Sequence, residues 1–520
     1  MRLAKAALFL CLAATPACAD TDLDKIQAYI RKSWTFLLRT HGQLVEAAHD
    51  PKLGDRQKWP VYVSRKENLA RIKADLAKEL SPDKLAQLDI RQLGDGLPSE
   101  DGLLYLPKPY VVPGGRFNEM YGWDSYFIEL GLLFDGEKQK ALDIVDNFLY
   151  EVEHYQRVLN ANRTYYLTRS QPPFLSRMVL ELKPDDNYLR KAWPALKSTY
   201  EFWNSAPHRM PSGVVLSRYA DLGEGPASEV LSGEKDEKGR THYDRIRDYF
   251  RAHSDTIAET DIKPYYDRAN NQLTPLFYKG DRSMRESGFD PSNRFGPFNI
   301  DVLNFYPVEL NSLLWLFEKD MIEISARLGK PTDVWEKRAA ERAMQIQTLL
   351  WDEKQGLYLD YQFAQGKRRN YPFGTTFFPL WVGLATPEQA ARIVANLPLL
   401  ERDGGLLTSP FESGNQWDAP FGWAPLQMVA VEGLRKYGYN READRIAVKW
   451  LALVGREFLR TGIIVEKYDV VHNTSQVSAN IHFGYTSNEI GFGWTNAAFQ
   501  RMLDRLSPEA RASLEAKLKN

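Results

Sequence analysis

The sequence predicts an all-α fold, either a toroid of helices or a helical bundle, from three observations. First, apolar residues recur at steps of three and four over residues 141–152 and 310–328, as expected for helices that bury one face. Second, a helix-capping pattern stands at residues 386–389. Third, loops containing glycine and proline separate the helical segments, while clean two-residue alternations are few.

Further helices follow from the same periodicity. They are expected at residues 23–48, 63–79, 119–134, 184–204, 333–351, 421–437 and 496–504. Thr386 and Pro387 are expected to begin a helix that continues to Leu397. Asn440 is expected to cap a helix carrying Trp450. Strands should be short and confined to loops, for example around residues 164–167.

We expect residues 20–520 to form a single domain, because no change in composition marks a boundary and no repeat of fixed period is present. Within residues 221–250, the charged run GEKDEKGR at 233–240 is expected to be a solvated loop. The polar segment 507–520 is expected to be a helical tail.

The N-terminus has the pattern of an export signal over residues 1–19. Arg2 and Lys5 are basic, residues 6–14 are apolar, and Ala17-Cys18-Ala19 fits a cleavage site. A buried N-terminal helix and lipidation at Cys18 are the alternatives. Both cysteines of the chain, Cys11 and Cys18, fall in this segment. The interpretation predicts an exported protein, most simply periplasmic, whose mature chain has no disulfide.

The composition favours a small neutral ligand. The formal charge of −1 argues against a nucleic-acid partner, which requires a basic surface. No other apolar run reaches the roughly 18 residues of a membrane span. Aromatic residues make up 12% of the chain, and flat aromatic rings suit the CH faces of sugars.

Several kinds of chemistry lack their motifs. The histidines form no His-Glu-x-x-His pair, so a zinc site is not expected. A phosphate-binding loop, a dinucleotide fingerprint and a Gly-x-Ser-x-Gly elbow are also missing from the sequence. Carboxylates, arginines, amides and indoles remain plentiful in segments flanked by glycine and proline, and these groups suit sugar hydrolysis.

Four such segments stand out. They are PGGRFNEMYGWDSY at 113–126, NANRTYYLTRSQPP at 160–173, ESGFDPSNRF at 286–295, and QWDAPFGWAP at 416–425, the last followed by EKYD at 466–469. Each segment alone also has a structural explanation, such as an indole packed over a carboxylate. Spacing along the chain does not establish that residues 290 and 466 meet.

The first and fourth segments resemble the two signature patterns of the trehalase family at every fixed position. Further blocks match in order, including 162–166, 169–173, 286–290, 466–469 and 491–496, so that the likeness spans about residues 25–505. The resemblance implies an (α/α)6 barrel that hydrolyses a small α-glucoside with inversion and needs no metal or cofactor.

The resemblance also implies roles for particular residues. Asp290 corresponds to the general acid and Glu466 to the general base. The sugar-binding positions correspond to Arg116, Phe117, Trp123, Asp124, Asn160, Arg169 and Trp417. Inversion requires the two carboxyl groups to lie about 6.5–9.5 Å apart, which leaves space for one water.

Two blocks depart from the family pattern. An Arg-Pro-Glu segment is expected near 222–232, but the arginine is missing and Glu229 is the one candidate replacement. A glycine-rich run ending in glutamate is replaced by residues 478–485, which leaves Glu489 as the candidate carboxylate. Both departures concern substrate contacts rather than the acid and the base.

The leading hypothesis is therefore an inverting α,α-trehalase that acts as a monomer on a disaccharide. A hydrolase of another small α-glucoside with the same fold is the first alternative. A sugar-binding helical barrel without turnover is the second.

Overall fold

The computed structural model describes residues 21–519 except 52, 53, 55, 212, 232–234, 237, 478 and 480. The predicted export signal at residues 1–19 lies outside the described residues. No helix in the described part of the chain is both long enough and apolar enough to cross a membrane.

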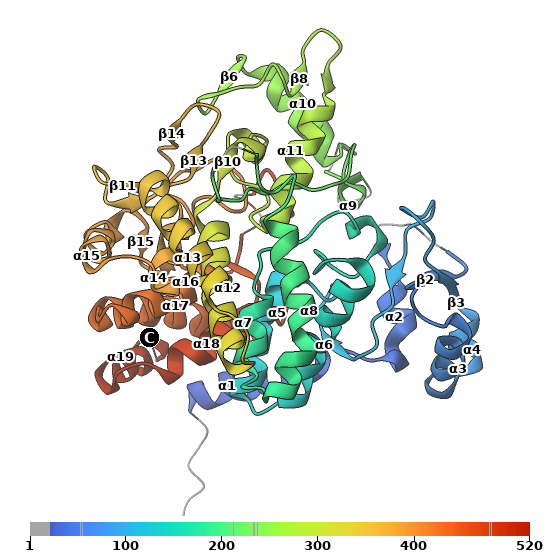
Figure 1. Cartoon of the computed structure of the whole chain (residues 1–520). Coiled ribbons are helices and arrows are strands. Elements are labelled where there is room, and N and C mark those ends of the chain that lie inside the picture. The colour runs from blue at the N-terminus through green and yellow to red at the C-terminus, as the bar shows by residue number, and fades with distance from the viewer. Residues whose placement is uncertain are drawn as a thin grey trace, which may run out of the picture.

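Within the described residues, six helices pack side by side in chain order and close into a ring (Figure 1). They are α5 (Gly122–Phe134), α7 (Leu175–Glu181), α12 (Val308–Arg327), α14 (Phe378–Val382), α16 (Ala424–Lys436) and α18 (Gly493–Asp504). The ring closes where α18 packs against α5. Gly131 permits this contact, because a Cβ there would lie 2.7 Å from Trp34 and 2.9 Å from Ala497.

A second set of helices surrounds the ring. It contains α1 (Asp22–Phe36), α6 (Lys138–Tyr155), α8 (Asp186–Trp203), α13 (Asp333–Gln345), α15 (Pro387–Ala395), α17 (Asn440–Thr461) and α19 (Pro508–Leu518). Helices α6, α13 and α17 each pack on the inner helix next to them in the chain, and α1 and α19 cover α17. This alternation of inner and outer helices confirms the predicted all-α, (α/α)6-type fold.

Four predicted features differ in the structure. The expected helix 23–48 breaks after Phe36 and resumes only at α2 (Leu44–Ala48), while the expected helix 63–79 begins at Leu69 as α3 (Leu69–Glu79). Asn440 is the first residue of α17 rather than its cap. The strand expected around 164–167 is wrong: Thr164–Tyr166 form a 3-10 turn, because Tyr165 and Tyr166 both pack into one small apolar cluster instead of alternating between two faces.

A small parallel sheet lies beside the ring. Its strand order is β3 (Leu88–Gln92), β2 (Trp59–Val63), β4 (Leu103–Leu104), with Val61 opposite both Ile90 and Leu103. Helices α3 and α4 (Pro82–Ala86) lie beside this sheet in Figure 1.

Outside residues 228–286, the other strands are two or three residues long and pair in loops. They are β1 (Leu38–Arg39), β5 (Tyr110–Val111), β10 (Phe305–Tyr306), β11 (Trp351–Asp352), β12 (Leu357–Tyr358), β13 (Tyr361–Gln362), β14 (Lys367–Arg368), β15 (Glu401–Arg402), β16 (Gly405–Leu406), β17 (Phe421–Trp423) and β18 (Lys467–Asp469). The antiparallel pair β17–β18 sets Gly422 opposite Tyr468 and so joins the segment of Trp417 to that of Glu466.

Residues 228–286 form a unit that projects from one end of the ring (Figure 1). It comprises α9 (Ser228–Leu231), α10 (His242–Ala252), the hairpins β6 (Thr256–Ile257) with β7 (Thr260–Asp261) and β8 (Tyr266–Asp267) with β9 (Gln272–Leu273), and α11 (Pro275–Glu286). Ile246, Phe250 and Phe277 belong to its own buried core. The described residues of the run 233–240 are irregular, as expected, whereas α10 was not predicted.

Candidate active site

A cavity of about 510 Å³ opens in the protein and is lined by loops of the ring. Five of the lining segments precede the N-terminal end of an inner helix: 113–121 precede α5, 160–174 precede α7, 287–307 precede α12, 411–423 precede α16, and 466–492 precede α18. The rest of the lining includes residues 49–51 and residues of α9, α10 and α11. The ring therefore gathers segments that are distant in sequence. The volume is in the range of pockets for small molecules.

The structure brings all nine sequence-predicted site residues to this cavity. Its lining includes Arg116, Phe117, Trp123, Asp124, Asn160, Arg169, Asp290, Trp417 and Glu466. The two carboxylates and the aromatic and basic residues thus share one space.

Asp290 presents its carboxyl group to the cavity, with 32% of the side chain exposed. Its Oδ2 lies 3.3 Å from Nη1 of Arg285, and the side-chain amide of Gln416 donates to its backbone carbonyl. Burial raises the pKa of Asp290 to about 7, although Arg285 and Arg169 act to lower it. A carboxyl group with this pKa is protonated in part of the molecules at neutral pH.

Glu466 lies in a different setting, since its side chain is almost fully buried. The ammonium of Lys467 lies 3.0 Å from Oε2, and the hydroxyl of Tyr485 donates to Oε1. Lys467 is itself buried and also donates to the carbonyl of Ser487 at 2.9 Å. The negative charge of Glu466 is therefore compensated on both oxygens.

Aromatic rings form one wall of the cavity. Trp417 stacks on Trp423 with ring centroids 3.8 Å apart and an angle of 7° between the planes. Trp123 contacts Trp417 and Phe289, and Gly288 leaves space for it: a Cβ there would lie 2.8 Å from the indole. These contacts fix the rings in single orientations.

Asp124 lies in the first turn of α5, beside this wall. Burial, followed by the charges of Glu466 and Asp290, raises its pKa well above the usual value. The two proposed catalytic groups therefore both act electrostatically on Asp124.

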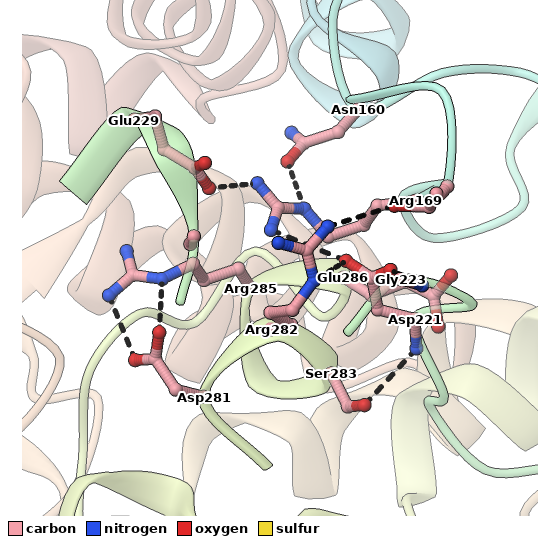
Figure 2. Close-up of polar contacts among 12 residues, drawn as sticks. Asn160, Arg169, Asp221, Gly223, Glu229, Asp281, Arg282, Ser283, Arg285 and Glu286 are labelled. Carbon is pink, nitrogen blue, oxygen red and sulfur yellow. Dashed lines mark hydrogen bonds and ion pairs between the residues drawn. The ribbon is translucent and has the colours of Figure 1, made fainter. Parts of the chain in front are cut away.

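Arg169 and Asn160 form a fixed polar corner (Figure 2). Nε of Arg169 donates to Oδ1 of Asn160 at 2.8 Å, and its guanidinium pairs with Glu229 and, at 3.5 Å, with Asp221. Burial acts to raise the pKa of Glu229, but Arg169 and Arg285 outweigh it and lower the pKa. Glu229 therefore lies at the cavity as a carboxylate. It is the residue that the sequence offers as a replacement in the segment 222–232, where the arginine of the family's Arg-Pro-Glu pattern is missing.

Arg116 lies on the opposite rim, where Nε is 3.2 Å from Oε1 of Glu489. Its guanidinium also lies over the rings of Tyr485 and Phe117, at 4.8 and 5.1 Å from their centroids. Glu489 thus contacts Arg116, which lines the cavity, but Glu489 is not itself part of the lining.

Several lining residues were not singled out from the sequence. They include Arg285, Tyr485, His242, Arg245 and Gln171. Arg285 carried a signal in its position, because it immediately precedes the ESGFD block. Tyr485 lies in the block 478–485 that departs from the family pattern, and His242 lies outside the blocks that match it, so no motif marked either residue.

No group of three or more His, Cys, Asp or Glu residues in the described chain is arranged to hold a metal ion.

Comparison with known proteins identifies similar sequences over most of the chain. A family model described as Trehalase matches residues 25–507. Cytosolic neutral trehalase from Emericella nidulans is 36% identical over 455 residues, which cover 78% of this chain and 59% of the fungal protein. The protein of the same name from Saccharomyces cerevisiae is 36% identical over 461 residues, covering 81% and 60%. The chain thus spans about three fifths of the length of these relatives.

Solved structures agree at the level of the fold. The neutral trehalase from Saccharomyces cerevisiae superimposes with a TM-score of 0.79 at 30% identity and covers 96% of both chains. A mannosylglycerate hydrolase from Thermus thermophilus has a TM-score of 0.50 at 19% identity, which shows a shared fold alone.

The predicted export and periplasmic location are contradicted by these comparisons. The relatives from Emericella nidulans, Neurospora crassa and Saccharomyces cerevisiae are named cytosolic neutral trehalases. The pattern at residues 1–19 therefore does not establish the location of the protein.

The match over residues 25–507, together with the relatives at 36% identity, identifies the family. This chain belongs to the trehalase family.

Proposed function

We propose that this protein hydrolyses α,α-trehalose to two glucose molecules with inversion at the attacked anomeric carbon. The observation that carries the proposal is the meeting of Asp290, whose pKa is raised to about 7, and the buried carboxylate Glu466 at one cavity. Membership of the trehalase family supports trehalose as the substrate.

Asp290 is the proposed general acid. It donates its proton to the bridging oxygen as the bond between that oxygen and the anomeric carbon breaks. The group must be protonated before reaction, and its raised pKa supports this requirement.

Glu466 is the proposed general base. It accepts a proton from a water molecule, whose oxygen attacks the anomeric carbon from the face opposite the leaving sugar. Lys467 and the hydroxyl of Tyr485 orient the carboxylate. The balanced reaction consumes one water and returns the acid and base to their starting protonation states once protons exchange with solvent.

The proposed sugar contacts come from the polar corner and the aromatic wall. Arg169, Asn160 and Arg116 offer donors for hydroxyl groups, and Asp124 offers acceptors. Trp123, Trp417 and Phe117 provide apolar surface for the sugar rings. The combination suits a neutral disaccharide.

Proton NMR during hydrolysis tests the reaction directly. Inversion of one ring predicts equal initial amounts of α- and β-glucose from trehalose, before mutarotation. Initial release of α-glucose alone contradicts inversion. In a panel of disaccharides, faster glucose release from another α-linked glucobiose than from trehalose selects the alternative substrate class, and binding without release selects a sugar-binding protein.

We also propose that residues 20–520 form one catalytic domain and that the protein acts as a monomer. Closure of the ring by the first and last inner helices supports one domain, and all groups proposed for the reaction come from one chain. Light scattering coupled to size exclusion tests the monomer, and limited proteolysis tests the domain.

A further inference from the structure

Asp281 and Arg285 lie one turn apart on α11 and form a two-point ion pair (Figure 2). Nη2 of Arg285 lies 3.0 Å from Oδ1 of Asp281, and Nε lies 3.2 Å from Oδ2. Asp281 is 1% exposed and Arg285 is 12% exposed, so solvent screens this pair little. A fork of this kind fixes the plane of the guanidinium as well as its position.

This ion pair uses Nε and Nη2 of Arg285, so that Nη1 remains available to face the cavity. Nη1 lies 3.3 Å from Oδ2 of Asp290, the proposed acid. The side chain of Asp281 is in turn held by the hydroxyl of Tyr243 on α10, which donates to Oδ2 at 2.8 Å. A chain of contacts therefore runs from α10 through Asp281 and Arg285 to the reacting group.

We propose that Asp281 is a positioning residue of the active site: it fixes the plane of the Arg285 guanidinium, whose Nη1 faces Asp290, and it shares the positive charge of that arginine. The inference deepens the proposed function and rests on it for the role of Asp290. Asp281 does not line the cavity, so any effect of Asp281 on the reaction is transmitted through Arg285 or through its charge.

The charges around Asp290 give the direction of the effect. The ionisable groups facing it are Arg285, Asp281, Arg169, Glu229, Asp124 and Tyr485, with Glu466 on the same cavity. Burial raises the pKa of Asp290 most, the two arginines oppose burial, and Asp281 and Glu229 add to it. Without its partner, Arg285 is free to direct its whole charge to Asp290, which favours the carboxylate.

The test compares Asp281→Asn with Arg285→Gln by measuring kcat/KM on trehalose from pH 5 to pH 9. The alkaline limb of this profile reports the proton on the acid of the free enzyme. Asp281→Asn removes a negative charge, so the limb should move to lower pH, by about 1 unit. Arg285→Gln removes a positive charge, so the limb should move to higher pH by a similar amount.

Asp248→Asn is the matched control. Asp248 also pairs with arginines, Arg240 at 2.9 Å and Arg251 at 2.7 Å, but it lies on an exposed face of α10 outside the cavity lining. In the Asp248→Asn variant, the alkaline limb of the kcat/KM profile should match that of the wild type.

An unchanged limb in Asp281→Asn, or shifts of both variants in the same direction, overturns the proposal. If Asp281→Asn does not fold, Asp281→Glu replaces it: this variant keeps the charge but displaces the carboxylate from Arg285, and an unmoved limb in Asp281→Glu refutes the positioning role. A separate readout is the titration of the Asp290 carboxyl carbon by NMR, identified by its loss in Asp290→Asn. That titration should shift in the same two directions even if trehalose is not hydrolysed, so failure of the proposed function remains distinguishable.

Discussion

The two proposed catalytic carboxyl groups lie in different surroundings. Asp290 reaches the cavity and has one cation, Arg285, at 3.3 Å. Glu466 is buried between an ammonium at 3.0 Å and a tyrosine hydroxyl. Asp290 therefore has the surroundings of a group that holds a proton, and Glu466 has those of a group that holds a charge.

Under the proposed roles, local contacts distinguish the acid from the base, since both side chains carry the same carboxyl group. Glu466 has a donor on each carboxylate oxygen, whereas the cation beside Asp290 lies at Oδ2. Different surroundings of this kind allow two carboxyl groups in one site to take the roles of acid and base.

The largest effects should come from Asp290→Asn and Glu466→Gln. Removing a general acid or base lowers the rate by about 10²–10⁴-fold, so each variant should hydrolyse trehalose at that reduced kcat. Neither change removes side-chain volume, and circular dichroism should show a folded protein in both cases.

A second substrate separates the two roles. Fluoride leaves without protonation, so Asp290→Asn should retain much more of its rate on α-glucosyl fluoride than on trehalose. Glu466→Gln should lose rate on both substrates, because attack by water is common to them. Equal losses on both substrates in Asp290→Asn contradict its role as the acid.

Lys467→Met should give the next largest effect, mainly on stability. Lys467 has no exposed side-chain surface, so its removal leaves the charge of Glu466 buried without its cation. Breaking a buried ion pair in this way costs about 3–5 kcal/mol in the free energy of unfolding, which denaturant titration measures.

Lys191→Met provides the comparison for this variant. Lys191 pairs with Asp146 at 2.7 Å, but its side chain is 58% exposed. An exposed pair contributes about 0–1 kcal/mol, so this variant should be nearly as stable as the wild type. Equal stability of the two lysine variants argues against a buried, compensated Glu466.

The sequence predicted the helices of the ring better than the loops that carry the chemistry. The segment 310–328 has a continuous apolar stripe, and α12 lies there with small changes at its ends. The break after Phe36 and the 3-10 turn at Thr164–Tyr166 depend on contacts with distant segments, which periodicity does not report.

The site was predicted through the resemblance of the two signature segments and of further blocks to the trehalase family, rather than through geometry. The meeting of Asp290 and Glu466 depends on the closed ring and on the β17–β18 pair, neither of which is visible in local spacing. Arg285 was missed for a related reason: its spacing from Asp281 marks an ion pair on a helix, but not which side faces the cavity.

The smallest expected effect is the decline of kcat/KM of the wild-type enzyme at alkaline pH. This decline tests the role of Asp290 alone. Since burial raises the pKa of Asp290 to about 7, the protonated form is lost as the pH rises through that value. Above it, kcat/KM should fall about tenfold for each pH unit. The decline should be absent on α-glucosyl fluoride, which does not need the proton, and a decline shared by both substrates would assign it to another group. A decline of kcat/KM on trehalose that begins near pH 4 to 5 would mean that Asp290 behaves like an ordinary exposed aspartate. The contrast between the two carboxyl groups would then depend on the contacts of Glu466 alone.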